Sequence, residues 1–367
     1  MLTVLDGNSE VETRVEGFPA FFAKQYEYFH YLEMCRKLKK DGCAFKGRGV
    51  GASEIAASNC ARAYTCIENS NNIVTGFSEE YVTTTLEKVW QELDFLNTCT
   101  EDAFRHVRQK YDSAMLKKAS KVDTDGNESG WGSVIQGMVS DKPEKLRGKR
   151  CYSLYYEESG NHARLEDTYV QGRALVVING IRVGSRFVFG TSCGESNPKL
   201  AGLKKMFYNP DNYTMLPYKH NHTRNGDWVL TGYFIPSFSI WFGNETEKGF
   251  DHRGVVYEDK AKRSYQDHWD TVTDPNILLK DKAEYCFTPE DAFIMEGSNA
   301  FNMEKLSEQQ VNIDHGLVEK PQAVRFRWGL TSEGTVDRHS TPKIEYGTGG
   351  RTLMIEEPIK GPDGIPV

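Results

Sequence analysis

The chain has 367 residues, of which 38% are hydrophobic and 12% aromatic, and its formal net charge at pH 7 is −7. This length and apolar content predict one large or two moderate domains with hydrophobic cores, and they exclude an intrinsically disordered chain. The modest negative charge excludes a uniformly basic nucleic-acid coat, although local basic tracts remain compatible with contacts to phosphates.

Cysteine usage and the N-terminal residues both bear on the compartment. The eight cysteines are scattered, without a CxxC pair or zinc-like spacing, which is typical of free thiols in a reducing cytoplasm. The N-terminus carries acidic residues in place of the basic and then apolar pattern of a signal peptide, and no run approaches the ~18 apolar residues of a membrane span. We therefore expect a soluble intracellular protein without membrane contacts.

Extended and helical segments alternate through the first half of the chain. Short apolar runs predict buried strands at 42–45, 71–78, 133–139, 151–158 and 186–192. Apolar periodicity and end signals predict helices at 20–40, from Ser53 onward, and at 79–96. The polar segment 120–133 is predicted to be a loop, and helix-like residues separate the last two strands. This alternation favours an α/β fold, in which helices cover a mostly parallel sheet.

The second half of the chain has a different texture. From about Phe207, aromatic segments interrupted by prolines predict irregular strands and long loops at the far edge of the sheet. A charged block at 257–283 is predicted to be helical, and the segment that begins at Lys343 is predicted to be a hairpin followed by a proline- and glycine-rich tail. We interpret the chain as an N-terminal helical segment, a core with a smaller irregular lid subdomain, and a C-terminal linker with a hairpin, at 1–40, 41–300 and 301–367.

The segment KGRGVGAS (46–53) has the outline of a phosphate-binding loop between a strand and a helix. Gly51 and Ser53 match the pattern G-x-x-x-x-G-K-[ST], but Lys46 takes its first glycine position and Ala52 its lysine position. In such loops, backbone N–H groups and a lysine surround the phosphates and a hydroxyl holds Mg²⁺. Because the loop is nearly a closed ring, Lys46 is placed to reach the β- and γ-phosphates. The predicted nucleotide contacts in this loop are Lys46, Gly47, Gly49, Val50, Gly51, Ala52 and Ser53.

A glycine-rich turn without a ligand is the alternative interpretation of this loop, and two later strands favour the nucleotide site. The apolar strand CYSLYYEESG delivers Glu157 and Glu158, and we predict that Glu157 orders the Mg²⁺ shell together with Ser53 while Glu158 takes the proton of the attacking water. The strand RFVFGTS delivers Thr191 and Ser192, hydroxyl residues that can sense the γ-phosphate and couple hydrolysis to movement. Solvated glutamates and loop-starting hydroxyls are the alternatives.

In this order, the loop, the acidic strand and the GTS strand, followed by GYFIPS and TPEDAF, resemble the large terminase subunit of tailed bacteriophages over nearly the whole chain. YYEESG resembles the acidic motif of that family, TPEDAF its P-x-EAF-type segment, and LRGKR the Arg-Gly before the acidic strand. Some branches of the family also carry the lysine at the start of the loop. The resemblance implies a P-loop NTPase fold of the RecA/ASCE type and an ATPase motor that uses ATP and Mg²⁺.

The resemblance also implies roles for further residues. Gln25 resembles the adenine-reading glutamine of the family, which places segment 1–40 on the adenine side, although a glutamine on a helix surface is the alternative. Arg48 resembles the arginines that stabilise charge on the transferring phosphoryl group, in their own or a neighbouring subunit, with Arg147 and Arg150 as lesser candidates. Glu157 departs from the family, which usually has aspartate there.

The partners are implied by the resemblance alone. They are double-stranded DNA, the portal protein and the small terminase subunit. The assembled form is expected to be a homo-oligomeric ring, and the isolated chain a monomer. The expected location is the host cytoplasm, with docking at the procapsid portal.

The basic tracts 116–121, 142–150 and 199–205 are candidates for phosphate contacts. The family's C-terminal nuclease is not expected from this chain. The alternatives are another P-loop translocase or helicase, or a non-hydrolysing portal-binding scaffold. His220 and His222 lack a third ligand at metal-binding spacing.

Overall fold

The computed structural model describes residues 2–5, 14–17, 20–100, 113–146, 148–192, 199–244, 247–293, 322–327, 343–346 and 352–354. The chain divides into two compact units, residues 1–298 and residues 299–367. Within the part of the chain that is described, no helix combines the length and apolar character needed to cross a bilayer.

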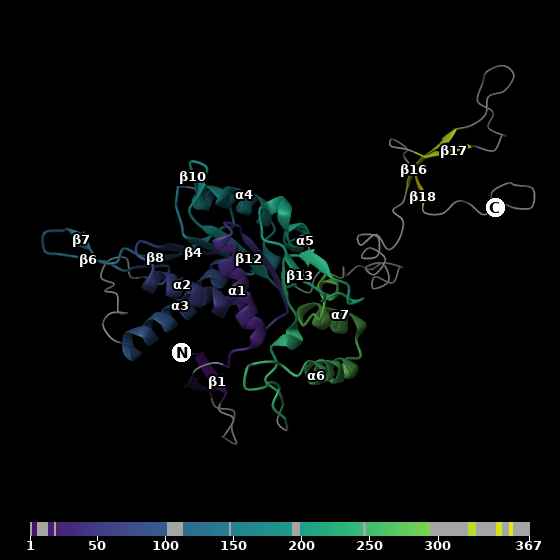
Figure 1. The fold of residues 1–367 in the computed structure, drawn as a ribbon, viewed down its shortest axis with the longest axis horizontal. Coiled ribbons are helices and arrows are strands. Elements are labelled where there is room, and N and C mark those ends of the chain that lie inside the picture. Colours follow the sequence, from purple (N-terminus) through teal and green to yellow (C-terminus); the bar gives the residue numbers. More distant parts are fainter. Residues whose placement is uncertain are drawn as a thin grey trace, which may run out of the picture. The chain divides into compact units, whose positions relative to one another are not determined.

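The first unit is built on a seven-stranded sheet with the order β15-β3-β12-β9-β4-β8-β5 (Figure 1). Its strands are β3 (Gly42–Lys46), β4 (Asn71–Gly76), β5 (Leu116–Lys118), β8 (Val134–Val139), β9 (Ser153–Tyr156), β12 (Ser185–Gly190) and β15 (Tyr233–Ile235). All neighbours are parallel except β5, which runs antiparallel to β8. One strand, β12, lies between the loop strand β3 and the acidic strand β9. The mostly parallel sheet confirms the predicted α/β fold.

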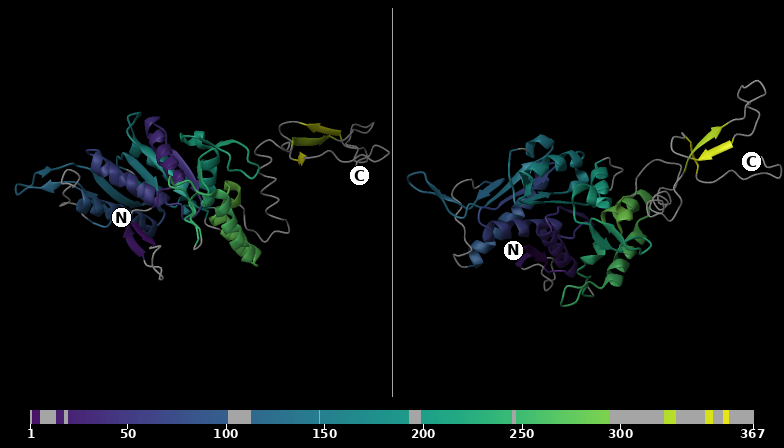
Figure 2. Two further views of the ribbon diagram at one scale, coloured as in Figure 1. Left: turned by 60° about the horizontal axis from the view of Figure 1, so that its bottom comes forward. Right: turned by 45° about the horizontal axis from the view of Figure 1, so that its top comes forward.

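Helices cover both faces of this sheet (Figures 1 and 2). They are α1 (Ala23–Lys37), α2 (Ala52–Cys66), α3 (Glu79–Cys99), α4 (Leu165–Val176) and α5 (Leu200–Tyr208). The core on one face joins α1, α2 and α3 to Ala44 of β3, and the core on the other face joins α4 and α5 to Cys43 and Phe45. Successive strand residues point to opposite faces, so β3, whose residues before Lys46 are all apolar, must be covered on both sides.

Two expectations about local structure need correction. The strands β9 and β12 end at Tyr156 and Gly190, so the paired acids and Thr191 lie in the turns that follow the strands and not inside them. The predicted helical block at 257–283 is confirmed, and it consists of two helices, α6 (Glu258–Thr271) and α7 (Pro275–Glu284). They are separated because the Asp274 side chain caps the first backbone N–H groups of α7, whose first residue is a proline.

The segment 120–133 is a hairpin and not a loop. Strands β6 (Lys121–Val122) and β7 (Glu128–Ser129) pair antiparallel and extend beyond the β5 side of the sheet (Figures 1 and 2). The carboxylate of Asp123 accepts backbone N–H groups from Asp125 and Asn127, at 2.9 and 2.8 Å, which closes the turn. Polar composition concealed this hairpin because its stability comes from turn hydrogen bonds and not from an apolar face.

The C-terminal hairpin was predicted wrongly. In the second unit, β16 (Gln322–Arg327) pairs antiparallel with both β17 (Lys343–Tyr346) and β18 (Thr352–Met354), giving the order β17-β16-β18. The two segments predicted to pair with each other therefore flank a third strand. The sequence QAVRFR alternates apolar and charged residues over its last four positions, which is typical of a strand, so this signal was present and was missed.

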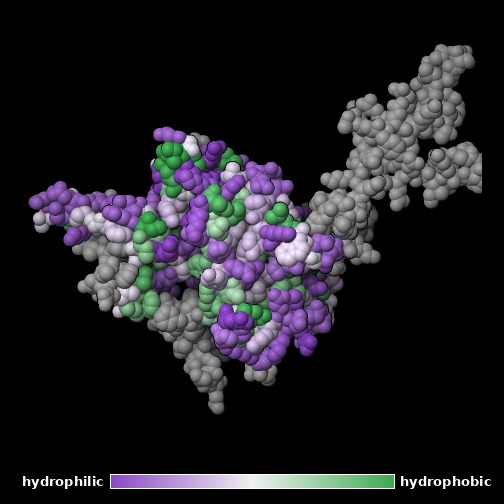
Figure 3. Space-filling view, in the orientation of Figure 1, coloured by the Kyte–Doolittle hydropathy of each residue, from purple (hydrophilic) through white to green (hydrophobic). Residues whose placement is uncertain are grey.

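Short elements complete the chain. They are the hairpins β1 (Leu2–Leu5) with β2 (Arg14–Gly17), β10 (Val177–Ile178) with β11 (Ile181–Arg182) and β13 (Tyr218–His220) with β14 (Val229–Thr231), the helix α8 (Pro289–Ala292), and the 3-10 turns η2 (Pro143–Leu146), η3 (Ser159–Asn161), η4 (Pro210–Tyr213) and η5 (Ser237–Ser239). The surface in Figure 3 is mostly hydrophilic, with a hydrophobic group over β10 and α4, where Val170, Ile181 and Val183 are exposed.

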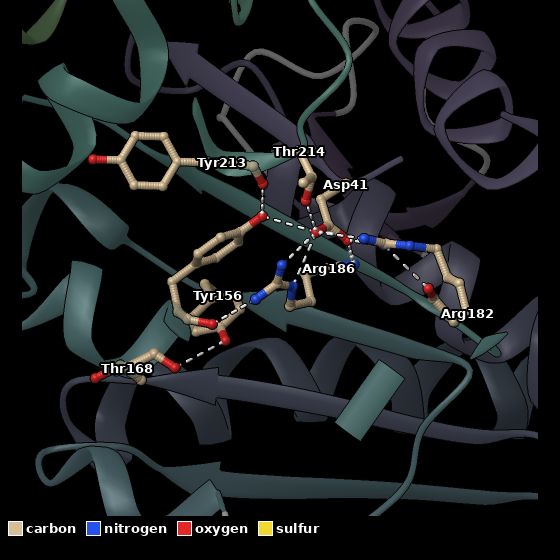
Figure 4. Close-up of polar contacts among 9 residues, drawn as sticks. Asp41, Tyr156, Thr168, Arg182, Arg186, Tyr213 and Thr214 are labelled. Atoms are coloured by element: carbon tan, nitrogen blue, oxygen red, sulfur yellow. Dashed lines mark hydrogen bonds and ion pairs between the residues drawn. The ribbon is translucent and has the colours of Figure 1, made fainter. Parts of the chain in front are cut away.

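A buried carboxylate anchors the start of β3 (Figure 4). Asp41 is fully buried, and its Oδ1 accepts from Nη1 of Arg182 at 2.6 Å and the backbone N–H of Arg186 at 2.8 Å. Its Oδ2 accepts from Nε and Nη2 of Arg186, at 3.0 and 2.6 Å, and from the hydroxyl of Tyr169 at 2.8 Å. Burial alone would raise the pKa of Asp41, but the two guanidinium groups hold it below its usual value. The network ties β3 to β11, β12 and α4.

Replacement of Asp41 by alanine leaves the buried guanidinium of Arg186 without its counter-charge. Breaking one partner of a buried ion pair costs about 3–5 kcal/mol, so we expect the free energy of unfolding in urea at pH 7 to fall by that amount. Asp167→Ala is the control, because it removes one partner of the exposed pair between Arg164 and Asp167 and should cost less than about 1 kcal/mol. Equal losses for the two variants would contradict an anchoring role for Asp41.

Candidate functional site

A cleft of about 1040 Å³ opens at the carboxyl ends of β3, β9 and β12. Parallel strands bring the residues that follow them to one edge of a sheet, and ligands of open α/β sheets bind at that edge. The predicted residues that line the cleft are Lys46, Arg48, Gly49, Val50, Gly51, Ala52, Ser53, Glu157, Glu158, Thr191 and Ser192. The structure therefore brings together three segments that lie far apart in the sequence.

The glycine loop leads directly into the N-terminus of α2. Gly49 and Gly51 both have φ near +79°, in the left-handed region that glycine adopts without steric cost. Gly51 is the N-cap of α2, so the first backbone N–H groups of a 15-residue helix start at the loop. Gly47 does not line the cleft. A Cβ there would lie 1.9 Å from Oγ of Ser237, so Gly47 allows the loop to pack against the end of β15.

Lys46 reaches the acidic side of the cleft from the last position of β3. Its side chain is almost fully buried, and Nζ donates to Oε1 of Glu158 at 3.1 Å. Ala52, which occupies the usual lysine position, is buried at the start of α2. The ammonium group that the loop presents to the cleft therefore comes from its first residue.

Glu157 and Ser53 form a pair with the donor chemistry of a magnesium site. Oγ of Ser53 donates to Oε1 of Glu157 at 2.5 Å, while the buried Oε2 has no hydrogen-bond partner among the described residues. Burial and, next, the charge of Glu158 raise the pKa of Glu157 to about 7. Hydroxyl and carboxylate oxygens are the ligands Mg²⁺ prefers, so these two residues fit the ion.

The rest of a magnesium shell would have to come from the nucleotide and water. No group of three or more histidine, cysteine, aspartate or glutamate side chains suited to a metal occurs in the described ranges. Mg²⁺ is commonly bound by one or two protein ligands together with substrate phosphates, which is the arrangement that Ser53 and Glu157 can offer. His220 is instead buried, with its Nε2 at 2.8 Å from Oγ1 of Thr231.

Glu158 faces the opposite way from Glu157 because of its backbone. It adopts φ 41° and ψ 50°, a left-handed conformation that costs a non-glycine residue on the order of 1–3 kcal/mol. Its Oε1 accepts from Lys46, and its Oε2 accepts from Oγ1 of Thr191 at 3.1 Å. Burial would raise the pKa of Glu158, but the charge of Lys46 and these hydrogen bonds lower it below its usual value. Two adjacent carboxyl groups thus have pKa values shifted in opposite directions.

The turn after β9 touches the turn after β12. A Cβ on Gly160 would lie 1.9 Å from the backbone oxygen of Thr191, and one on Gly190 would lie 2.6 Å from the backbone nitrogen of Gly160. This contact explains why a glycine closely follows the paired acids. It places the backbone of the acidic turn directly against the residue predicted to sense the γ-phosphate.

Two further predicted residues connect the loop to other elements, Gln25 from α1 and Arg48 from within the loop itself. Gln25 donates through Nε2 to the backbone oxygen of Val50 at 3.1 Å, and its Oε1 accepts the backbone N–H of Phe22 at 3.2 Å. Its amide therefore joins the start of α1 to the loop. Arg48 forms an ion pair with the carboxylate of Glu284, and its backbone N–H donates to the backbone oxygen of Glu284 at 2.8 Å.

The lesser arginine candidates are not brought to the cleft. Arg150 donates from Nη1 to the backbone oxygens of Lys149 and Ala174, both at 3.0 Å, and it does not line the cleft. Arg147 lies outside the described residues.

Several cleft residues were missed by sequence reasoning. They are Glu80, Tyr81, Thr84, Thr85, Lys88, Asn161, Lys199, Phe242 and Glu284. Thr85 acts against the rise in the pKa of Glu157 that burial causes, and the run of three threonines at 83–85 was a usable signal, because β-branched residues are poor choices for a helix surface. Phe242, which is 63% exposed and packs edge-on against Phe22 at 5.1 Å, carried no local signal.

Comparisons with known proteins add structures but no sequence relatives. No family model matches the chain, and no curated protein matches it. The large terminase ATPase domain of Thermus phage P74-26 is 13% identical, with a TM-score of 0.45, over 68% of this chain and 88% of that one. The large terminase of the thermophilic bacteriophage D6E in complex with ADP is 12% identical, with a TM-score of 0.35, over 54% of this chain and 44% of that one. Because these sequence identities and TM-scores are low, the similarity does not establish a function for this chain.

Gly160→Ala should disturb the junction between the two turns. The added Cβ overlaps the backbone oxygen of Thr191, so we expect the free energy of unfolding to fall by about 1–3 kcal/mol, as for other overpacked sites. Gly76→Ala is the matched control, because a Cβ there meets its nearest atoms at 3.4 Å, an ordinary contact. Urea denaturation of both variants measures the difference. If Gly160→Ala is as stable as Gly76→Ala, the turns do not need this close approach.

Proposed function

We propose that the chain is a P-loop ATPase that hydrolyses ATP with Mg²⁺ in this cleft. The observation that carries the proposal is the juxtaposition of a glycine loop at a helix N-terminus, the Ser53–Glu157 pair, and a second carboxylate, Glu158, held by Lys46 and Thr191. Phosphate binding, metal binding and proton acceptance each require one of these three parts.

The loop supplies the phosphate-binding part. The backbone N–H groups at the start of α2 and the ammonium group of Lys46 neutralise charge on the β- and γ-phosphates. Ser53 and Glu157 would hold Mg²⁺ through their oxygen atoms, and the ion would supply positive charge that neutralises the phosphates. Contact with the ion favours the ionised form of Glu157, whose pKa is otherwise raised by burial.

Glu158 supplies the general base. Its lowered pKa keeps it ionised at neutral pH, so it can accept a proton from the attacking water. In the structure, Oε1 of Glu158 accepts a hydrogen bond from Lys46. When the phosphates attract Lys46, that oxygen is released toward water, and the loss of the neighbouring positive charge makes Glu158 a stronger base. Thr191 stays on Oε2, which links the state of the base to the end of β12.

The finer proposal is that this ATPase is the motor of a viral DNA-packaging terminase. It is supported by the order of the loop, the acidic turn, the GTS strand and the GYFIPS and TPEDAF segments in the sequence. Under this proposal the partners are double-stranded DNA, the portal protein and the small terminase subunit. The active form is a homo-oligomeric ring, docked at the procapsid portal in the host cytoplasm.

The basic tracts offer exchangeable charges for DNA phosphates. Each tract has a lysine paired with a surface acid: Lys118 with Glu128, Lys145 with Asp141 at 2.6 Å, and Lys205 with Glu166 at 2.8 Å. Such exposed pairs contribute little to stability, so phosphate groups can replace the acids. Contacts of this kind weaken steeply with salt.

Glu158→Gln tests the ATPase. The variant keeps the shape of the side chain but cannot accept a proton, so we expect ATP hydrolysis to fall by about 10²–10⁴-fold while ATP binding is retained. Phosphate release is measured with Mg²⁺ and with EDTA, and Asp167→Asn, an exposed acid on α4 outside the cleft, is the control. Turnover by Glu158→Gln at the parent rate would reject Glu158 as the base. The same assay with duplex DNA, at increasing salt, tests the motor separately, since an ATPase that ignores DNA is not a packaging motor.

Lys46→Ala tests the lysine at the start of the loop. Hydrogen bonds to charged groups contribute about 1.5–3 kcal/mol, so we expect ATP affinity to fall by about 10- to 150-fold. Isothermal titration with ATP and Mg²⁺ measures this affinity, and circular dichroism confirms folding. Lys88→Ala is the matched control, because Lys88 also lines the cleft but is paired with Glu54 at 2.7 Å. Parent-like binding and turnover by Lys46→Ala would show that this lysine does not serve the phosphates.

A further inference from the structure

Arg48 is joined to the end of α7 by two different contacts. The backbone N–H of Arg48 donates to the backbone oxygen of Glu284 at 2.8 Å, and the guanidinium group forms an ion pair with the carboxylate of the same residue. Glu284 is the last residue of α7, and both residues line the cleft. Glu284, at the end of α7, is therefore the ion-pair partner of Arg48, which lies inside the loop.

The backbone contacts around this pair fix its position. Gly47 donates its backbone N–H to Ile235 at 2.9 Å, and Ser237 donates its own to Cys286 at 3.0 Å. The loop, the end of β15 and the end of α7 are therefore connected through main-chain atoms on both sides of Arg48. A change of partner by the Arg48 side chain requires no movement of these segments.

The side-chain contact is weaker than the backbone contacts. The side chain of Arg48 is 61% exposed and that of Glu284 is 30% exposed. Ion pairs in such surroundings contribute little, because water screens the charges and two long side chains lose freedom. Hydrogen bonding to Glu284 and the charge of Glu284 raise the pKa of Arg48, and the charge of Glu158 acts in the same direction, so the guanidinium group lies in the field of both acids.

We propose that Glu284 competes for the guanidinium group of Arg48, and that a phosphate group of a nucleoside triphosphate replaces Glu284 as the partner of Arg48 when the nucleotide binds. A triphosphate carries more negative charge than one carboxylate and accepts the same bidentate hydrogen bonds from arginine. Glu284 is thus a positioning residue that lowers nucleotide affinity by competing for Arg48. This inference rests on the proposed ATPase, and it assigns Arg48 to the cleft of its own subunit.

The test is the affinity for ATPγS with Mg²⁺, measured by isothermal titration, so that binding is separated from turnover. Glu284→Gln keeps the shape of the side chain and removes the competing charge, and we expect about fivefold tighter binding, the upper range for an exposed ion pair. Glu284→Asp keeps the charge and should bind like the parent. Glu80→Gln is the matched control, because Glu80 is an exposed acid at the rim of the same cleft, on the first turn of α3, and we expect less than a twofold change.

A second experiment asks whether the gain in ATPγS affinity requires Arg48. It separates competition between Glu284 and the phosphates for Arg48 from simple charge repulsion between Glu284 and the nucleotide. In an Arg48→Ala background, the Glu284→Gln change should give no gain in affinity, because there is no guanidinium group left to release. The inference is overturned if Glu284→Gln binds no more tightly than Glu80→Gln, or if its gain persists without Arg48. If the parent protein itself binds no ATPγS, the proposed ATPase fails together with the inference, and this outcome is distinct from the other two.

Discussion

The buried carboxylate of Asp41 fixes the register on which the whole cleft depends. It holds the start of β3 against the start of β12 through Arg186, and β12 then runs parallel to β3 with Gly190 opposite Phe45. The residues that follow these two positions are Thr191 and Lys46, so an ion pair at one end of the strands determines which side chains meet at the other. A slip of one residue would turn every side chain of β3 to the opposite face. The buried ion pair between Asp41 and Arg186 thus helps to place Lys46 and Thr191 beside each other in the cleft.

The division of labour between Glu157 and Glu158 comes from the backbone. Both residues lie in the turn after β9, where the side chain of Glu158, in a left-handed conformation, contacts Lys46 and Thr191 while Glu157 contacts Ser53. One carboxyl group is buried with a single hydroxyl partner and a raised pKa, whereas the other has a cation beside it and a lowered pKa. The same residue type is therefore suited to two tasks, metal binding and proton acceptance.

Much of the fold and of the cleft could be predicted from the sequence, and two of the predictions that failed share a cause. Apolar runs and periodicity located the parallel strands of the sheet and the first helices, and the topology of parallel strands then placed Lys46, Glu157 and Thr191 at one edge. Two of the errors concern interactions between segments distant in sequence: β16 pairs with both strands of the predicted hairpin, and Glu284 reaches the loop from α7. Local patterns contain no information about such partners. The left-handed backbone of Glu158 was equally invisible, since glutamate carries no preference for that conformation.

The position of β3 in the sheet also constrains the order of events during synthesis. Its two neighbours, β12 and β15, are the strands at Ser185–Gly190 and Tyr233–Ile235, far later in the chain. At translation rates of about 5–20 residues per second, the loop strand waits roughly 10–40 s for its last neighbour to be made. Until then its apolar residues have no partner strands, and closing such long loops is slow. The emerging chain therefore cannot assemble the cleft before β15 has been made, and until then β3 lacks the neighbour that completes its pairing in the sheet.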